Sequence, residues 1–340
     1  MVHPMLRPHP SLSLRYKAAL ALVLWASAGD TRLARADDPP TASPSQVSVL
    51  IAVGAPGEEE FGTEFTQWAT QLEAIARRGG AAATVIGARK GDPIPAREKL
   101  QLALANEPKE GTAELWLVLI GHGTFDGREA KFNLRGADVS ASELQGWLQP
   151  FHRPLAIIDT TAASAPFLAR LAGTNRVVVT ATRSGSEANF TRFGKFFCAA
   201  LGDTAADLDK DGQTSLLEAF LMASRQVKEF YEEEGRLVTE HALLDDNGDG
   251  LGTPPDWFRG IRATKTAKDG AALDGVRAHQ LHLVHSAAEL ELSDATRARR
   301  DELELSIARL REGKRSMSEA EYYKQLETLL LELARLYGPK

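Results

Sequence analysis

The stretch LWLVLIGHG, residues 115–123, decides how this sequence folds. Its first six residues are apolar without interruption, which is typical of a strand buried on both faces in a parallel sheet that helices cover on each side. The runs LAIID (155–159) and VVVTA (177–181) share this pattern. Glycines flank His122 at the end of the first run, which places an imidazole at the carboxyl end of a strand, where open α/β sheets carry their chemistry.

Short apolar runs alternate with helical stretches through the first two thirds of the chain. We predict strands at Val47–Val53, Ala83–Ile86, Leu115–Ile120, Leu155–Asp159 and Arg176–Thr182, and helices at Phe61–Arg78, Pro95–Asn106, Ala141–Leu148, Pro166–Leu171 and Thr191–Leu201. A capping box from Ser140 to Glu143 marks the start of the third helix. This alternation predicts an α/β fold, a three-layer α/β/α sandwich with a mainly parallel sheet.

Composition excludes several classes of protein. The 340 residues are 43% hydrophobic and 25% charged, which is ordinary for a globular chain and excludes a wholly disordered or multi-span membrane protein. The net charge of −6 lacks the basic footprint of nucleic-acid-binding proteins, so we expect no nucleic acid partner. The single cysteine, Cys198, excludes intramolecular disulfides and multi-cysteine metal sites.

The first 36 residues carry the pattern of a secretory signal peptide. Basic residues precede the apolar run at 18–28, and the small-residue cleavage pattern Ala34-Arg35-Ala36 precedes Asp37. This apolar run is shorter than the roughly 20 residues that a membrane-spanning helix needs. We therefore expect cleavage, export to the periplasm or the extracellular space, and no membrane span in the mature chain. The alternative is a segment that is kept as an N-terminal anchor.

The remaining chain divides by composition into a linker and three regions. A Pro/Ser-rich linker covers 37–46, and the α/β domain at 47–202 precedes an acidic region at 203–265 and a C-terminal region at 266–340. The C-terminal region is predicted to end in a helical hairpin, because apolar residues recur there at helical spacing: Leu303, Ile307, Leu310, Tyr322, Leu326, Leu329, Leu333 and Leu336. This apolar stripe either packs within the chain or binds an unknown protein partner as a coiled coil.

The acidic region contains a twelve-residue loop, 207–218, with the spacing of an EF-hand calcium loop. Alternate positions supply oxygen atoms, and Gly212 allows the sharp turn at the sixth position. The glutamate at the twelfth position can bind with both carboxylate oxygens. Helical patterns flank the loop on both sides. We predict a Ca²⁺ site here with the ligands Asp207, Asp209, Asp211, Gln213, Ser215 and Glu218; the alternative is a solvated acidic turn.

A second loop of this kind, 245–256, is predicted to be the weaker calcium site. Aspartate at the twelfth position reaches less far than glutamate, and Pro254-Pro255 disfavours an ordinary exit helix. The two loops begin 38 residues apart, so we expect them to pack together as paired EF-hands do. An exported pair of this kind suits a structural ion better than a sensor. The predicted ligands are Asp245, Asn247, Asp249, Leu251, Thr253 and Asp256.

Two motifs that bear on catalysis lie about 40 residues apart. His122 and Gly123 end one apolar block, and Asp159, Thr160 and Thr161 end the next. A block ending in His-Gly, followed by a block ending in an acidic residue, a small residue and cysteine, resembles the caspase and legumain-like cysteine peptidases. The resemblance implies their fold, with His122 as general base, the Gly123 N–H as oxyanion donor and Thr161 at the position of the nucleophilic cysteine.

The resemblance, which covers Val47–Leu201, departs from the family at the nucleophile. A threonine hydroxyl needs a base and is hindered at its branched carbon, whereas cysteine reacts as a thiolate. Cys198 lies in an apolar helical segment and is expected to be a buried small side chain. We predict a catalytically inactive, calcium-binding protein that acts as a binding or scaffold module. The alternative is a peptidase-like hydrolase that uses Thr161 or Ser164 with His122.

Three histidines near the C-terminal region, His279, His282 and His285, recur at every third position. Their spacing matches no metal-binding motif. We therefore expect them to be ordinary surface or packing residues.

Overall fold

Parallel strands build the central sheet of the part of the chain that the structure describes. The computed structural model describes residues 46–187 and 190–338, so the predicted signal peptide and most of the predicted linker lie outside the described residues. The strands, in their order across the sheet, are β2 (Ala82–Ile86), β1 (Ser48–Val53), β3 (Leu115–Ile120), β7 (Leu155–Asp159), β8 (Arg176–Thr180) and β9 (Leu243–Asp245). All neighbours pair in parallel except β8 and β9.

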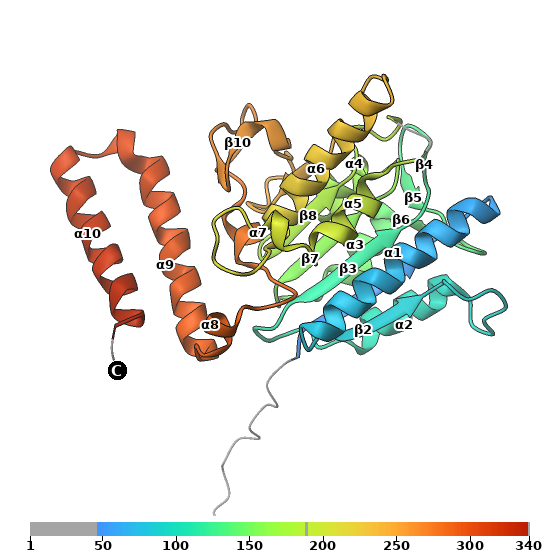
Figure 1. Cartoon of the computed structure of the whole chain (residues 1–340), viewed down its shortest axis with the longest axis horizontal. Helices are drawn as coiled ribbons and strands as arrows, with labels where there is room; N and C mark the ends of the chain where they lie inside the picture. Colours follow the sequence, from blue (N-terminus) through green and yellow to red (C-terminus); the bar gives the residue numbers. More distant parts are fainter. Residues whose placement is uncertain (1–45, 188–189, 339–340) are drawn as a thin grey trace, which may run out of the picture. The chain divides into compact units, whose positions relative to one another are not determined.

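Successive residues of the strands point to opposite faces of the sheet and fill two separate cores. Val49, Ile51 and Val53 of β1 pack on one face under α1, α5 and α6, whereas Leu50 and Ala52 pack on the other under α2, α3 and α4. Figure 1 shows this arrangement of helices on both sides of the sheet. The helices are α1 (Glu59–Arg78), α5 (Phe193–Ala200), α6 (Leu216–Glu233), α2 (Ala96–Asn106), α3 (Ala141–Leu148) and α4 (Ala165–Leu171). The predicted α/β/α sandwich is therefore confirmed.

A small antiparallel sheet, absent from the sequence-based prediction, follows β3. It consists of β4 (Gly123–Phe125), β5 (Ala130–Phe132) and β6 (Val139–Ser140). These strands are only two or three residues long, and a glycine-rich, polar stretch of this length carries no clear period. The predicted capping box follows this sheet and is confirmed. The Ser140 hydroxyl accepts the Glu143 N–H at 3.1 Å, and the Glu143 carboxylate accepts the Ser140 N–H at 3.0 Å.

The sixth strand comes from the acidic region rather than from the predicted α/β domain. In β9, Asp245 lies beside Val178 of β8, and Leu243 lies beside Thr180. The sequence at this point resembles a calcium loop, which hides the short strand that leads into it. The described residues accordingly belong to one compact unit in which regions 47–202 and 203–265 share a sheet.

Several element boundaries differ from the prediction by one or two residues. The strand predicted to reach Thr182 ends at Thr180, and the helix predicted from Thr191 begins at Phe193. Thr191 is instead tied to the end of β7 because its hydroxyl donates to the Thr160 carbonyl. The first N–H groups of α5 donate to the carboxylate of Glu240, which caps this helix from a position 47 residues further along the chain.

The C-terminal region consists of short elements and then the predicted helical hairpin. α9 packs against α10, and Ser318 caps α10 by accepting the Glu321 N–H at 3.2 Å. No helix among the described residues combines the length and the hydropathy that a membrane crossing requires. From residue 204 onward the remaining elements are η1 (Thr204–Ala206), η2 (Pro255–Trp257), β10 (Phe258–Arg259), β11 (Arg262–Ala263), α7 (Val276–Gln280), α8 (Ala287–Leu290), α9 (Asp294–Glu312), η3 (Gly313–Ser316) and α10 (Glu319–Leu336).

Candidate functional site

His122 lies just beyond β3, at the carboxyl edge of the sheet, where the sequence predicts it. Its Nε2 lies 3.1 Å from the carbonyl oxygen of Pro56. The imidazole also contacts three aromatic rings, with centroid distances of 5.0 Å to Phe61, 5.2 Å to Phe65 and 6.1 Å to Phe190. The ring of Phe61 meets the imidazole edge-on at 87°. His122 is therefore held by a backbone oxygen and an aromatic cluster.

Gly123 lies directly against Thr161, as the resemblance implies for an oxyanion donor and a nucleophile. A Cβ atom at position 123 would lie 2.6 Å from Oγ1 of Thr161 and 3.0 Å from Cβ of Ala163. Only glycine fits this close approach, because real Cβ atoms do not come so near to other atoms. The structure thus brings the ends of β3 and β7 together at the predicted place.

The acidic residue before Thr161 is sealed inside the protein. Asp159 is fully buried, and its Oδ1 accepts the Thr161 N–H at 2.9 Å. Burial raises the pKa of Asp159 to about 6, although this N–H bond works in the opposite direction. Asp159 Oδ2 and the Thr161 hydroxyl oxygen are buried without a hydrogen-bond partner among the described residues.

Ser164 is committed to the packing between β7 and β8. Its hydroxyl lies 2.9 Å from the Thr182 hydroxyl and accepts the Thr182 N–H at 3.1 Å. Both side chains are fully buried. Among the described residues, neither Ser164 nor Thr161 forms a hydrogen bond with His122. His122, Thr161 and Ser164 thus lie near the same edge of the sheet, but no hydrogen bond connects the histidine to either hydroxyl.

Cys198 behaves as the sequence predicts. It is fully buried in α5 and has no disulfide partner among the described residues. Burial raises the pKa of its thiol to about 12. A thiol of this kind is not a thiolate at neutral pH and does not act as a nucleophile.

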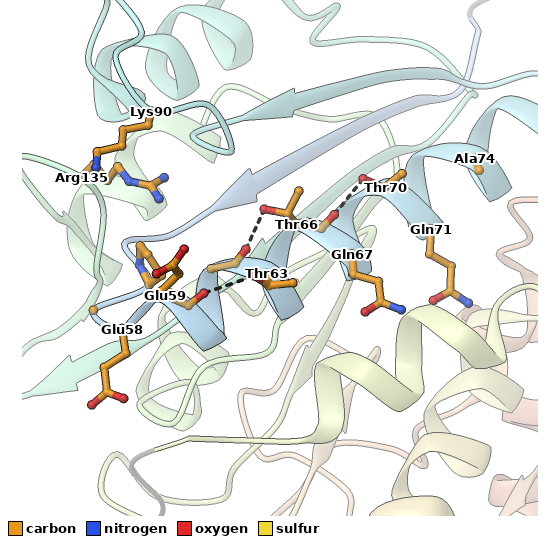
Figure 2. Close-up of a pocket in the computed structure, with 13 residues that line it drawn as sticks. Glu58, Glu59, Thr63, Thr66, Gln67, Thr70, Gln71, Ala74, Lys90 and Arg135 are labelled. Atoms are coloured by element: carbon orange, nitrogen blue, oxygen red, sulfur yellow. Dashed lines mark hydrogen bonds between the residues drawn. The ribbon is translucent and has the colours of Figure 1, made fainter.

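A polar groove starts beside this edge and follows the outer face of α1. Figure 2 shows Thr63, Thr66 and Thr70 along the helix, with Lys90 and Arg135 facing them from another part of the chain. The groove has a volume of about 1330 Å³ and begins at Pro56 and its neighbours. The threonine hydroxyls donate back to helix carbonyls, at 2.7 Å in the case of Thr66 and Gly62. Hydroxyl hydrogens that are used in this way are not free to bind a ligand.

The first predicted calcium loop brings three carboxylates close together. Carboxylate oxygens of Asp207, Asp209 and Asp211 lie within 4.8 Å of one another. Backbone N–H groups of the loop hold them: Lys210 and Gly212 donate to the two carboxylate oxygens of Asp207 at 2.6 Å and 3.1 Å. Like charges at this separation repel one another, and a cation between them removes that repulsion.

Glu218 closes the first loop from the start of α6. It is fully buried, its Oε1 accepts the Leu208 N–H at 2.7 Å, and its Oε2 accepts the Ser215 N–H at 2.8 Å. This carboxylate is therefore anchored to both ends of the loop by neutral donors. The donor set of the loop consists of hard oxygen atoms, which fits calcium.

The second predicted loop has the same local turns but a different setting. Asp245 Oδ1 accepts the Gly248 N–H at 2.8 Å, and Asn247 Oδ1 accepts the Asp249 N–H at 2.8 Å. Burial raises the pKa of Asp245 to about 6. Asp256, predicted as the last ligand, lies exposed in η2. Among the described residues, no residue of this loop belongs to a group of three or more Asp, Glu, His or Cys side chains close enough together to hold a metal ion.

Asp274 is hydrogen-bonded to three residues of the second loop. Its Oδ1 accepts the Asp246 and Asn247 N–H groups at 2.9 Å and 3.1 Å, and its Oδ2 accepts the Thr253 hydroxyl at 2.6 Å. Burial and the nearby Asp246 carboxylate raise the pKa of Asp274 to about 8. Thr253, a predicted ligand, is thereby engaged by Asp274. Sequence spacing could not reveal this residue, because it contacts the loop from 28 positions away.

We expected the two loops to pair with each other, but no β-bridge among the described residues joins them. Ser215 of the first loop bridges to His282, and Leu244 at the start of the second bridges to Thr253. The second loop starts from β9 in the central sheet and leads into Pro254-Pro255, so it lacks the helices that bring EF-hand loops together. A histidine-containing segment takes the place beside the first loop.

Comparisons with known proteins give similarity in fold at low sequence identity. No family model and no curated protein matches the chain. The crystal structure of the Drosophila initiator caspase Dronc is similar with a TM-score of 0.41 and 15% identity, over 62% of this chain and 83% of that chain. A Geobacter sulfurreducens protein gives 0.39 and 11%, over 59% and 93%. Caspase-1 from Spodoptera frugiperda gives 0.37 and 9%, over 60% and 86%.

Proposed function

We propose that this chain is an exported, calcium-binding protein of caspase-like architecture that has lost peptidase chemistry and acts as a binding or scaffold module. One contrast carries the proposal. The carboxylates of Asp207, Asp209 and Asp211 converge as a cation site requires, whereas His122 is bound to Pro56. The chain thus retains an arrangement for an ion and lacks one for a nucleophile.

The caspase-like architecture is supported by the positions of two motifs in the sheet. His122 and Gly123 follow β3, and Thr161 follows β7, which is the next strand in the sheet. Gly123 and Thr161 are in contact range. This is the juxtaposition that the resemblance to caspase and legumain-like peptidases implies, with threonine in place of cysteine.

The loss of peptidase activity is supported by how the hydroxyl groups are held. Thr161 is fully buried, and Ser164 is fully buried and bonded to Thr182. A nucleophile must reach the substrate and lie within hydrogen-bond range of its base. Neither hydroxyl meets these conditions in the described structure.

A role in binding is supported by the outer face of α10. Tyr323, Leu330 and Leu331 are 51%, 43% and 51% exposed, and with Leu326 they line an open hollow on this helix. Exposed apolar side chains that are grouped on one helix face are typical of a protein interaction site. Export is supported by the signal-peptide pattern at residues 1–36.

Calorimetric titration of the purified protein with CaCl2 tests the calcium claim. We expect binding in the wild type, and a loss of at least tenfold in affinity for Asp207→Asn, which keeps the shape of the side chain and removes its charge. Asp126→Asn, in the exposed turn between β4 and β5, is the matched control and should bind as the wild type does. A wild type that binds no Ca²⁺ rejects the claim.

Labelling with a hydroxyl-reactive phosphonate probe tests the inactivity claim. We expect no labelled product in the wild type, as in a Thr161→Ala and Ser164→Ala double variant. Labelling of the wild type that disappears in His122→Ala would instead establish a working hydrolase with Thr161 or Ser164 as its nucleophile.

A further inference from the structure

A histidine-containing segment packs directly against the first calcium loop. Ser215 in the loop forms an antiparallel bridge with His282, and the Leu216 N–H donates to the Leu281 carbonyl at 2.8 Å. His279 lies in the short helix α7, which precedes His282. Two imidazoles therefore lie beside a loop from which they are separated by about 70 positions in the sequence.

His279 reaches the carboxylates of the loop. Its Nε2 lies 3.1 Å from Oδ2 of Asp209. One ligand atom each from Asp209, Glu218 and His279 lies within 4.8 Å of the other two. Asp209 and His279 line a cavity of about 510 Å³, and Glu218 is fully buried behind them.

His282 offers a second imidazole to the same cavity. It is only 5% exposed, and its Nδ1 lies 3.3 Å from the Gln280 carbonyl oxygen, to which it must donate. Its Nε2 consequently carries a lone pair, and this buried atom has no hydrogen-bond partner among the described residues. Burial lowers the pKa of His282 to about 3, so the ring is neutral at physiological pH. His282 and His279 both line the cavity.

Arg300, a cationic side chain in this cavity, does not form an ion pair with the carboxylates of the loop. Arg300 also lines the cavity, but its guanidinium is paired with Glu289 at 2.6 Å and with Asp301 at 2.8 Å. Its charge is therefore balanced by its own partners. Arg300 therefore does not neutralise Asp209 or Glu218, and among the described residues the Glu218 oxygens are held only by neutral donors, the Leu208 and Ser215 N–H groups and the Ser215 hydroxyl.

We propose that Asp209, Glu218 and His279 form a binding site for a divalent transition metal ion of the zinc class, with His282 beside it in the same cavity. Calcium takes oxygen ligands, whereas imidazole nitrogen suits zinc and its neighbours. Two carboxylates and one imidazole leave the fourth position of a zinc ion open to water, as zinc sites with three protein ligands do. The inference rests on the loop proposed above for calcium, and because Asp209 and Glu218 are shared, the two ions compete for it.

Separate calorimetric titrations of the metal-free protein with ZnCl2 and CaCl2 test the proposal. We expect Zn²⁺ to bind the wild type and His279→Ala to weaken this binding at least tenfold, while the affinity for Ca²⁺ changes less than about twofold. Co²⁺ in place of Zn²⁺ should give a visible absorption spectrum that changes in His279→Ala.

His152→Ala is the matched control, because His152 also pairs with a carboxylate, Glu110, at 2.6 Å but lies far out on the surface. It should bind Zn²⁺ as the wild type does. A wild type that binds Ca²⁺ but not Zn²⁺, or a His279→Ala variant with unchanged Zn²⁺ affinity, overturns this inference and leaves the calcium proposal standing. A wild type that binds Zn²⁺ through His279 but no Ca²⁺ supports this inference and rejects the calcium proposal.

Discussion

The Nε2 atom of His122 lies 3.1 Å from the carbonyl oxygen of Pro56. Because a carbonyl oxygen can only accept a hydrogen bond, Nε2 carries the hydrogen and donates it. The loop after β1 thus fixes the tautomer and the orientation of the imidazole, and Phe61 and Phe65 pack against its faces and edges. His122, to which the resemblance assigns the role of a general base, is thus held in place by a backbone oxygen and by aromatic rings.

Replacement of His122 should therefore destabilise the protein. We expect His122→Ala to lower the free energy of unfolding by about 1–3 kcal/mol, because it removes the bond to Pro56 and the contacts with Phe61 and Phe65. Denaturant titration measures this change. Replacing a residue that serves catalysis commonly increases the stability of the protein. An increase in stability for His122→Ala would contradict the structural role and favour a working site.

Gly123→Ala should be destabilising because the new methyl group would lie 2.6 Å from the Thr161 hydroxyl. Both neighbours are buried, so we expect a loss of about 1–3 kcal/mol from overpacking. Gly146→Ala is the matched control, since Gly146 lies within α3 and has open space around its Cβ position. That substitution should stabilise the helix by about 0.5–1 kcal/mol. Equal effects of the two substitutions in thermal unfolding would disprove the close contact.

Asp159 should make stability fall as the pH rises from about 4 to 6. Its pKa is about 6 in the folded protein, above that of an unfolded aspartate, so the folded state binds more protons in this range. The contribution is full at low pH and lost above pH 6, with a size of about 3 kcal/mol. Asp159→Asn should lack this fall, measured as the difference from wild type in denaturant titrations at pH 4 to 8. Parallel pH profiles for the two proteins would refute the assignment.

Cys198 should be unreactive until the protein unfolds. Its thiol is fully buried and has a pKa of about 12, so we expect less than a tenth of the chains to react with iodoacetamide in native buffer at pH 8, and all of them in guanidinium. Ser184→Cys in a Cys198→Ala background places one thiol on the surface and should react readily. Rapid native labelling of the wild type would show that Cys198 is accessible.

The two loops that the sequence predicts to bind calcium should differ in their response to pH. Asp245 has a pKa raised to about 6 by burial, and a carboxylate must lose its proton to bind a cation. Calcium affinity of the second loop should therefore fall at least threefold between pH 7 and pH 5.5. Calorimetry on Asp207→Asn, which leaves only the second loop, and on Asp245→Asn, which leaves only the first, separates them. The same pH dependence in both variants would argue against this difference.

The elements of the sheet and its helices could be predicted because each one carries its own pattern. The uninterrupted apolar run at 115–120 predicts a strand covered on both faces, and that strand lies near the centre of the sheet. The capping box from Ser140 to Glu143 marks the start of a helix that the structure confirms. By contrast, β9 was not predicted, because its three residues form a strand only through pairing with β8.

The sequence by itself determined the α/β layering, the acidic loop with its alternating carboxylates and the presence of threonine at position 161, where the resemblance implies cysteine. These are properties of local pattern and of residue identity. Only the tertiary structure decided that His122 bonds to Pro56, that Asp274 bonds to the second loop and that His279 reaches Asp209. Such contacts join segments many residues apart, and their formation depends on packing that no local spacing records.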